Sequence, residues 1–301
     1  MNAHPMPSDI DLPPGVRLEA CPEPMVRLVV ETPLASGHLY LHGAHVAHFQ
    51  PAGHHQTLFM SARSQWARHK PIRGGIPLCL PWFGANPADP SAPMHGIARL
   101  TEWSLVSATA NAAGEIVATL AMDSATNPPY PCPHPFKAIF TAVFGTTLTV
   151  SLEIENTGAD TMPVSEALHT YLTVGDVRQV SIRGLAGCSF FDRLDDARTK
   201  TEGEAPITIT GETDRVYLDT DADVVVSDPS LGREITVSKR GSASTVVWNP
   251  WIAKAAAMPD FGDDEWPGML CIETANALGN AYQLAPGAKH TITTTLACGK
   301  L

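Results

Sequence analysis

Short runs of alternating apolar and polar residues dominate the chain. The clearest is 148–155 (LTVSLEIE), which ends at the turn sequence Asn-Thr-Gly. Comparable runs rich in Val, Ile and Thr occur at 27–31, 116–122, 180–182, 224–227 and 291–296. Alternation with a period of two is typical of half-buried antiparallel strands. The pattern therefore predicts an all-β protein.

Helical periodicity is scarce along the chain. Residues 253–258 have the composition of a single helical turn, and Pro259 ends it because proline lacks a backbone N–H. There is no strand–helix–strand rhythm, no G-x-G-x-x-G sequence and no phosphate-binding loop. Many short strands separated by glycine and proline turn signals indicate a large β-sandwich.

One stretch resembles an interdomain linker, the Pro-rich segment 127–135 (NPPYPCPHP). It is short, and a rigid loop between two strands explains it better. We therefore expect a polar N-terminal tail over residues 1–14 and a single β-sandwich domain over residues 15–301.

Composition narrows the choice of partner. The 301 residues include 20 Lys and Arg against 31 Asp and Glu, a net charge of -11, so no nucleic-acid partner is expected. No apolar window is long enough to span a membrane, and residues 1–10 do not resemble a secretory signal, which suggests a cytoplasmic protein. The six cysteines and 12 histidines lack metal-ligand spacing, so we expect reduced thiols and no metal.

Basic residues concentrate in one part of this acidic chain. Residues 51–100 hold a single acidic residue, Asp89, and the basic residues Arg63, Arg68, Lys70, Arg73 and Arg99. The segment also contains Gly74-Gly75, where the backbone could approach a ligand closely. Because the planar fork of arginine suits phosphate, an anion pocket explains this composition as well as a solvated basic patch does.

Three segments, taken in order along the chain, resemble one known family. They are 70–84 (KPIRGGIPLCLPWFG) with 94–99 (MHGIAR); 166–171 (EALHTY) with Gly184-Leu185 and Asp192; and 246–251 (VVWNPW) with 260–265 (DFGDDE) and 271–275 (CIETA). Together they resemble the glucose-6-phosphate 1-epimerases, or D-hexose-6-phosphate mutarotases, a branch of the aldose 1-epimerase superfamily. The resemblance extends from about Val29 to Leu296, and its specificity comes from all three segments being in register.

The resemblance implies a galactose-mutarotase-like supersandwich of antiparallel strands with an open cleft across one sheet. It assigns the chemistry to His169, in the LHTY sequence, and to Glu273, in the ETA sequence. Arg73 and Arg99 would meet the sugar phosphate and ring hydroxyls. Asp214 would bind sugar hydroxyls.

The segment 94–99 both supports the resemblance and departs from it. His95 falls where the superfamily places a second histidine of the cleft. Met94 stands where the family pattern has glutamine, and Ile97 replaces phenylalanine. Methionine lacks the amide donor and acceptor of glutamine, so the departure bears on which hexose is preferred more than on the reaction.

Interconversion of anomers needs only proton transfers. A base takes the proton of O1 and an acid protonates the ring oxygen O5; the ring then opens, the C1–C2 bond rotates and the ring closes on the other face. We hypothesise that Glu273 is the base and His169 the acid, with the roles exchanged on closure. No cofactor is expected, and the partner is a small-molecule sugar phosphate.

The residues alone leave other readings open. His169 could be a satisfied core histidine and Glu273 an exposed strand carboxylate, although the apolar neighbours of Glu273 would raise its pKa and suit a base. The competing functions are a mutarotase for unphosphorylated aldoses and a non-catalytic carbohydrate-binding sandwich. A glycosidase is less favoured because it needs two carboxylates facing one bond.

Several further residues stay unassigned. Arg215 could contact phosphate or pair with the neighbouring Asp214, and the indoles of Trp66, Trp82, Trp248 and Trp251 could stack on a sugar or belong to the core. The three consecutive acids at 263–265 point in different directions, so a solvated turn is expected rather than a cation site. No feature indicates an assembly, and a monomer is expected.

Overall fold

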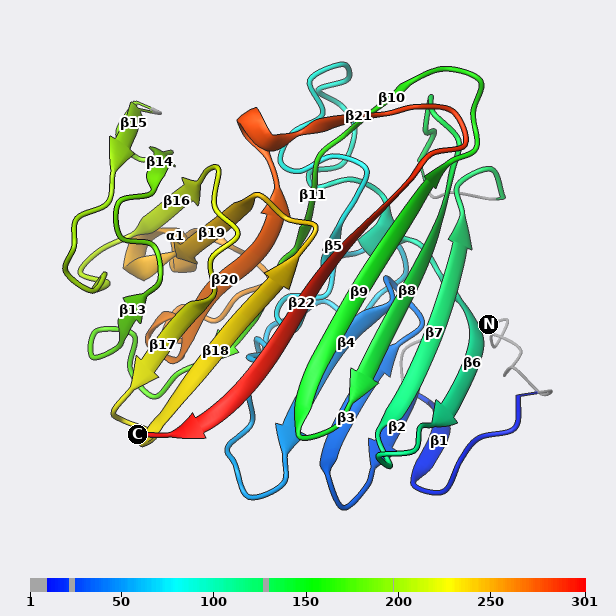
Figure 1. The fold of residues 1–301 in the computed structure, drawn as a ribbon, viewed down its shortest axis with the longest axis horizontal. Coiled ribbons are helices and arrows are strands. Elements are labelled where there is room, and N and C mark those ends of the chain that lie inside the picture. Colours follow the sequence, from blue (N-terminus) through cyan, green and yellow to red (C-terminus); the bar gives the residue numbers. More distant parts are fainter. Residues whose placement is uncertain (1–9, 22–24, 127–129, 197) are drawn as a thin grey trace.

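The front layer of the protein is a sheet of long strands. The computed structural model describes residues 10–21, 25–126, 130–196 and 198–301. Within these residues the longest strands form an eight-stranded antiparallel sheet, called here the front sheet, which faces the viewer in Figure 1. In order across it lie β13 (Ser181–Arg183), β17 (Val224–Asp228), β18 (Arg233–Arg240), β22 (Lys289–Lys300), β9 (Thr147–Asn156), β8 (Phe136–Phe144), β7 (Ile116–Asp123) and β6 (Ser104–Ala110).

A second sheet, called here the site sheet, carries the candidate chemistry. In the described part of the chain its order is β15 (Arg198–Thr201), β14 (Ser189–Asp192), β16 (Thr213–Tyr217), β19 (Ser244–Asn249), β20 (Met269–Asn276), β11 (Glu166–Leu168) and β5 (Leu78–Cys79), and β12 (Tyr171–Thr173) also pairs with β20. Every residue of β20 is buried. A charged or polar side chain on this strand is therefore removed from water.

Two smaller sheets and four short helices complete the described structure. The four-stranded sheet has the order β1 (Val16–Ala20), β2 (Val26–Glu31), β3 (Ala35–Tyr40) and β4 (His45–Pro51), and β10 (Met162–Val164) pairs with β21 (Tyr282–Leu284). The helices are α1 (Trp251–Ala257), η1 (Ala98–Leu100), η2 (Trp266–Gly268) and η3 (Leu278–Asn280).

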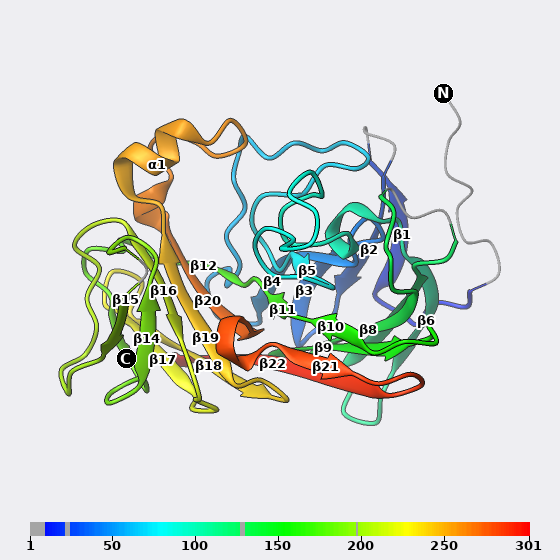
Figure 2. The same cartoon turned by 90° about the horizontal axis from the view of Figure 1, so that it is seen from above.

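The core fills the space between the front sheet and the sheets behind it, as Figure 2 shows from above. β3 lies against β8, and β20 lies against β22. Alternate residues of β7, β8 and β9 are buried. Across the layers, Phe49 of β4 contacts Phe144 of β8 with ring centroids 6.4 Å apart. The alternation in the sequence thus becomes one apolar face that packs inward and one polar face that meets solvent.

The strands and the helical turn expected from the sequence are confirmed. The six alternating runs correspond to β2, β7, β9, β13, β17 and β22, with ends that shift by one to a few residues. The helical turn expected at 253–258 is α1, which begins two residues earlier, at Trp251. Residues 130–135 form part of the loop expected between β7 and β8, and 127–129 lie outside the described residues. The expected tail lies outside them over 1–9 and contains no strand over 10–14.

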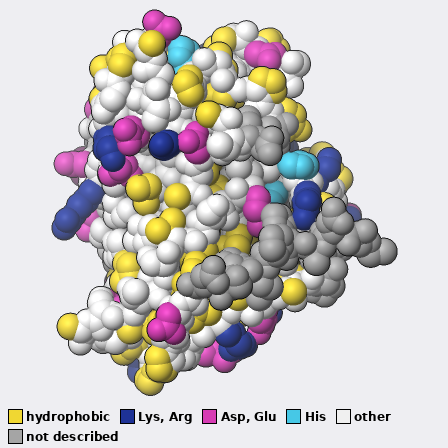
Figure 3. All heavy atoms as spheres, turned by 90° about the vertical axis from the view of Figure 1, so that its right-hand side faces the viewer, with side chains coloured by type: hydrophobic (Ala, Val, Ile, Leu, Met, Phe, Trp, Pro, Cys, Tyr) yellow, Lys and Arg dark blue, Asp and Glu magenta, His cyan; other side chains and the backbone are white. Residues whose placement is uncertain are grey.

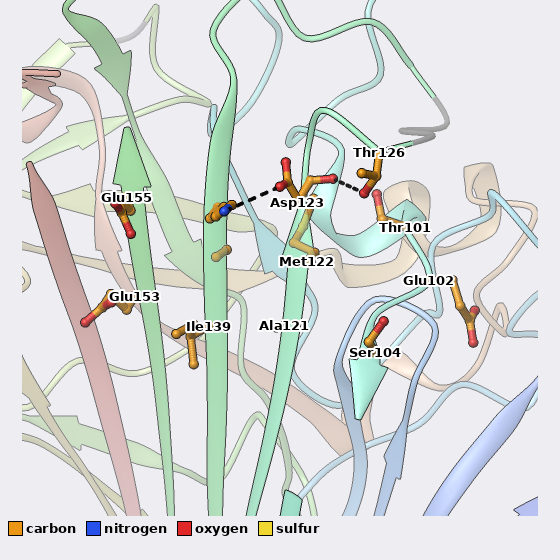
Figure 4. Close-up of a pocket in the computed structure, with 12 residues that line it drawn as sticks. Thr101, Glu102, Ser104, Ala121, Met122, Asp123, Thr126, Ile139, Glu153 and Glu155 are labelled. Carbon is orange, nitrogen blue, oxygen red and sulfur yellow. Dashed lines mark hydrogen bonds and ion pairs between the residues drawn. The ribbon is translucent and has the colours of Figure 1, made fainter. Parts of the chain in front are cut away.

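The surface shows mixed charge. Among the described residues, no helix is long and apolar enough to cross a membrane. On the face in Figure 3, basic and acidic side chains are interspersed. An open depression of about 360 Å³ lies over β7, β8 and β9 (Figure 4). Its charges pair with one another or with nearby lysines, Lys137 with Asp123 at 3.9 Å and Lys289 with Glu153 at 2.9 Å, and it holds no residue of the candidate site.

Candidate active site

His169 lies in a two-residue interruption of the site sheet. β11 and β12 both pair with β20 in one continuous register, so His169 and Thr170, which join them, lie across from Glu273 and Ile272. The N–H of His169 donates to the carbonyl of Pro77 at 3.0 Å, and the carbonyl of Thr170 accepts from the N–H of Ile272 at 3.2 Å. The interruption is therefore held on both sides, and it places the imidazole beside the part of β20 that carries Glu273.

Glu273 is a buried carboxyl group on the central strand β20. Its Oε1 lies 3.3 Å from Nδ1 of His169, close but not aligned for a hydrogen bond. Within the described residues, neither this Nδ1 nor Oε2 of Glu273 has a hydrogen-bond partner. Buried polar atoms are normally satisfied, so two such atoms on neighbouring titratable side chains mark this pair as a candidate reactive site.

Burial favours the uncharged form of both members of this pair. Desolvation raises the pKa of Glu273 well above its ordinary value, and the negative charge of Asp214 raises it further. Desolvation lowers the pKa of His169 well below 6.5, and the electrostatic effects of His95 and Arg99 lower it further. The favoured form is thus a carboxyl group beside a neutral imidazole, and one proton moved between the two side chains gives the ionised form.

Two aromatic side chains fix the orientation of the imidazole. The ring of Tyr171 stacks on His169 with centroids 4.7 Å apart and planes 9° apart. Trp248 of β19 meets the imidazole edge-on at 6.1 Å. Trp248 is therefore the one of the four unassigned tryptophans that contacts the pair in the described structure. The other three have partners elsewhere: Trp66 with Tyr40, Trp82 with the carbonyl of Pro93 and Trp251 with Trp266.

Arg73 is held by an acid that the sequence did not single out. Its Nε and Nη2 donate to the carboxylate of Asp260 at 3.1–3.3 Å, and its Nη1 donates to the hydroxyl of Tyr171 at 2.8 Å. Asp260 lies 187 residues further along the chain. The contacts neutralise the charge of Arg73 and tie its guanidinium to the ring that stacks on His169.

Arg99 lies half-buried at the site without such a partner. Its Nη2 donates to the carbonyl of Met94 at 2.8 Å, its Nε has no hydrogen-bond partner, and none of the described acids forms an ion pair with it. Because a backbone carbonyl makes the contact, the presence of methionine instead of glutamine at position 94 leaves it intact. The side chain of Met94 itself is exposed.

The basic segment 51–100 divides between the site and the surface. Arg73 and Arg99 lie at the site, and the exposed residues are Arg63, Arg68 and Lys70. Arg63 pairs at 3.1 Å with Asp263, in the turn at 263–265 that the sequence predicted. Gly74-Gly75 makes close contacts with neighbouring backbone. A Cβ atom on Gly75 would lie 2.2 Å from the carbonyl oxygen of Val46, so these glycines serve a close approach within the protein.

His95 faces the pair from the loop between β5 and η1. Its ring centroid lies 5.8 Å from that of His169. The N–H of His95 donates to the carbonyl of Gly84 at 2.7 Å, and its Nδ1 accepts from the N–H of Gly84 at 3.2 Å. Its backbone is left-handed, with φ 62°, and Gly96 follows because a Cβ atom there would lie 2.0 Å from the carbonyl oxygen of Leu80. The geometry of the His-Gly sequence thus holds the imidazole toward the pair.

Asp214 shares the site face of the sheet, and Arg215 does not. Neighbours in a strand point to opposite faces, and Asp214 lies opposite Trp248 in the pairing of β16 with β19. Arg215 instead pairs with Glu202 at 3.1 Å, so it neither approaches the site nor neutralises Asp214. The partner of Asp214 is Arg193, which follows β14 and whose Nε lies 3.8 Å from Oδ1.

One group of side chains among the described residues has the geometry to hold a metal ion. Ligand atoms of His169, Cys271 and Glu273 all lie within 4.8 Å of one another. Burial raises the pKa of the Cys271 thiol well above its ordinary value, so the thiolate that binds zinc is disfavoured. The same cluster suits proton transfer without further change.

The six candidate residues are brought to one site, together with four that the sequence did not assign. The six are Arg73, His95, Arg99, His169, Asp214 and Glu273, and the additional four are Tyr171, Arg193, Trp248 and Asp260. Tyr171 was signalled by its place two residues after His169. Asp214 and Trp248 lie opposite each other in the pairing of β16 with β19, and alternation within either strand does not encode that register. Arg193 and Asp260 lie in connecting segments whose contacts no local pattern encodes.

An epimerase that works by acid and base requires one group that takes a proton and one that gives a proton. The buried imidazole of His169 and the carboxyl group of Glu273 provide such a pair. The fold and the site therefore define a protein of that class. Residues 28–297 match the family described as aldose 1-epimerase. The chain belongs to this family, and it is an isomerase.

Individual relatives agree with this assignment. The chain is 34% identical over 250 residues to a protein of Escherichia coli K12 named "Putative glucose-6-phosphate 1-epimerase", with 83% of each chain covered. It is 34% identical over 257 residues to a protein of the same name from Cenchrus ciliaris, covering 83% of this chain and 77% of the relative. The solved structure of a "putative mutarotase" from Salmonella typhimurium matches with a TM-score of 0.89 and 28% identity, covering 97% and 96% of the two chains. The galactose-mutarotase-like fold is confirmed.

Proposed function

We propose that the protein interconverts the α and β anomers of a hexose 6-phosphate, with glucose 6-phosphate the first candidate. The observation that carries the proposal is the buried contact of 3.3 Å between Nδ1 of His169 and Oε1 of Glu273. In the described structure neither this Nδ1 nor the second carboxyl oxygen of Glu273, Oε2, has a hydrogen-bond partner. The names of the Escherichia coli and Cenchrus ciliaris relatives support the substrate class.

The reaction requires one mobile proton in the pair. A proton passed from Glu273 to His169 first gives a carboxylate and an imidazolium. In ring opening, the carboxylate of Glu273 takes the proton of O1 while the imidazolium of His169 gives a proton to O5, which returns the pair to a carboxyl group and a neutral imidazole. This is the uncharged form that burial favours. After rotation about C1–C2, ring closure reverses both transfers and restores the ionised pair. The total number of protons on the pair is unchanged over the cycle, so the reaction balances without a cofactor.

The surrounding side chains provide the means to hold the substrate. Asp214 presents a carboxylate on the same face of the sheet, where sugar hydroxyls can donate to it. Arg99 brings a positive charge that no described acid pairs with, and a phosphate group would supply the missing anion. An unphosphorylated aldose would leave that charge uncompensated, which favours a sugar phosphate. A purely carbohydrate-binding role would leave the His169–Glu273 contact without a use.

Anomer exchange measured by NMR magnetisation transfer tests the proposal. We expect the protein to accelerate exchange of glucose 6-phosphate, and we expect Glu273→Gln and His169→Asn each to lower the rate by about 10²- to 10⁴-fold. Glu153→Gln, on β9 away from the site, is the matched control and should retain the rate. Circular dichroism and thermal unfolding of each variant separate loss of chemistry from loss of fold. Equal acceleration of free glucose would move the assignment to a general aldose epimerase, and no acceleration of either sugar would overturn it.

We extend the proposal to the setting in which the protein acts. A single domain over residues 15–301 is supported by one core cluster that includes residues from Val26 to Leu296. A cytoplasmic location is supported by the six cysteines, all described and all free. A monomer is supported by the exposed large apolar side chains, which are scattered over separate elements of the described surface. Light scattering of the purified protein tests the last point.

A further inference from the structure

Arg193 lies at the site with little to hold it. It follows β14, and its backbone N–H donates to the carbonyl of Asp214 at 3.0 Å. Its guanidinium makes only a loose ion pair with the carboxylate of Asp214, at 3.8 Å, and lies over the ring of Phe83 with Cζ 5.4 Å from the centroid. The side chain is 30% exposed. Stacking on an aromatic face keeps the guanidinium in place without using its hydrogen-bond donors.

Arg193 and Arg99 lie next to the same piece of backbone. Gly84 and His95 are joined by two hydrogen bonds. Nη2 of Arg193 lies 3.7 Å from the position that a Cβ atom on Gly84 would occupy. Nη2 of Arg99 donates to the carbonyl of Met94, the residue before His95, at 2.8 Å. The two guanidinium groups therefore both lie beside this bridge.

The charges around His95 agree with this placement. After desolvation, the positive charges of Arg99, Arg193 and Arg73 lower the pKa of His95, so all three arginines lie within electrostatic reach of it. Arg193 and Arg99 also lower the pKa of Glu273, which places them within reach of the reacting pair.

The three arginines differ in how far their charge is already neutralised. Arg73 has a multiply bonded carboxylate partner at 3.1–3.3 Å. Arg99 has no ion pair with any described acid, and Arg193 has a loose one. The carboxylate of Asp214 neutralises Arg193 only in part, because the two groups are 3.8 Å apart and not hydrogen-bonded. A phosphate dianion needs about two positive charges, and Arg99 and Arg193 are the two that the structure leaves available.

We propose that Arg193 is the residue that selects phosphorylated over unphosphorylated sugars. When the sugar phosphate binds, the guanidinium of Arg193 leaves the loose contact with Asp214 and donates to the phosphate together with Arg99. The carboxylate of Asp214 is then free to accept hydrogen bonds from sugar hydroxyls. This inference rests on the proposed function, and it names the group that sets the substrate class at that site.

Substitution of Arg193 tests the proposal by separating binding from chemistry. We expect Arg193→Gln to raise KM for glucose 6-phosphate by about 10- to 100-fold, the loss of one or two charge-assisted hydrogen bonds, with kcat changed by less than about threefold. Exchange of free glucose should change by less than about threefold. Arg193→Lys should recover part of the affinity, because it restores the charge without the planar fork. The affinity for inorganic phosphate, measured by calorimetry, should fall in parallel with 1/KM.

The matched control is Arg178→Gln. Arg178 also stacks on an aromatic ring, that of Trp266 at 5.6 Å, and pairs with an aspartate, Asp176, at 2.7 Å, but it is exposed and is not among the charges that act on the site histidines or Glu273. It should leave KM and phosphate affinity unchanged.

Three results would count against the assignment of Arg193. Unchanged KM and unchanged phosphate affinity in Arg193→Gln would show that it does not contact the phosphate. An equal loss for glucose and glucose 6-phosphate would show that it acts by positioning Asp214 instead. A parallel loss in Arg178→Gln would show a general effect of surface charge. Wild-type protein that exchanges neither sugar would overturn the proposed function, while phosphate calorimetry would still decide whether Arg193 binds the anion.

Discussion

Two ion pairs of the same length but different burial have aspartates three residues apart in sequence. Arg73 pairs with Asp260 at 3.1 Å, and Arg63 pairs with Asp263 at 3.1 Å. The side chains of the first pair are 20% and 12% exposed, and those of the second are 60% and 53% exposed. Replacing each aspartate by alanine therefore compares a buried and an exposed arginine left without its acid.

The expected costs differ because burial decides how much water can compensate. Removing one partner of a buried pair costs about 3–5 kcal/mol, and removing one of an exposed pair costs about 0.2–1 kcal/mol. The residual exposure of Arg73 and its remaining contact with the hydroxyl of Tyr171 reduce the first figure to about 2–4 kcal/mol. An unfolding entropy of about 2.1 cal/mol/K per residue gives about 0.6 kcal/mol/K for 301 residues. Asp260→Ala should thus lower Tm by about 3–6 °C, and Asp263→Ala by less than about 2 °C.

Thermal and urea unfolding at low and high salt measure this difference. The loss in Asp263→Ala should shrink at high salt because exposed charges are screened, and the loss in Asp260→Ala should persist. A double variant, Arg73→Met with Asp260→Leu, should recover part of the lost stability because no unpaired charge remains. Equal losses for the two aspartates, or a double variant less stable than Asp260→Ala, would refute the claim that burial makes the Arg73–Asp260 pair the stronger constraint.

Two further predictions concern pH. The negative charge of Asp214 raises the pKa of Glu273. Asp214→Asn should therefore lower that pKa and move the alkaline limb of the kcat/KM profile to lower pH. An alkaline limb that does not move would contradict the electrostatic effect of Asp214 on Glu273. Burial raises the pKa of Glu166 in the folded protein above its ordinary value of 4.5, so Glu166 binds its proton more tightly in the folded than in the unfolded state. The stability that this proton contributes is therefore lost as the pH rises from 4.5 through the folded-state pKa. Stability relative to Glu166→Gln, measured by urea unfolding at pH 5 and pH 8, should therefore fall at the higher pH, and a constant difference would rule this out.

The front sheet could be predicted from sequence because one of its faces is buried and the other is exposed to solvent. β7, β8 and β9 alternate buried and accessible residues along their length, and their amino-acid sequences show the matching alternation of apolar and polar residues. The site sheet gave no such signal. β20 is buried on both faces, so its eight residues read as a mixed apolar run, and β11 and β12 have three residues each. Strands this short are set by their pairing with β20 and not by their own pattern.

The candidate site was accessible from sequence only where the motifs themselves carried the residues. His169 and Glu273 were assigned by resemblance, and the structure brings them to 3.3 Å. Arg193 could not be found in the same way, since it reaches Asp214 only because β14 pairs with β16. Of the two roles left open for Arg215, a pairing with Asp214 is disfavoured because adjacent residues in a strand point to opposite faces.

The arginines of the basic segment show why composition alone left an anion pocket and a solvated patch equally open. The structure divides these arginines between the site and the surface, and distant acids decide which site arginine is already paired. The sequence around Arg73 suggests a phosphate ligand. Asp260, in a connecting segment far along the chain, pairs with it and neutralises its charge. The guanidinium also donates to Tyr171 and so supports the stack of Tyr171 on His169. Arg99 keeps its charge because no described acid reaches it. Substituting Asp260 should therefore affect stability first, whereas substituting Arg99 should affect anion binding first, although both residues belong to one site.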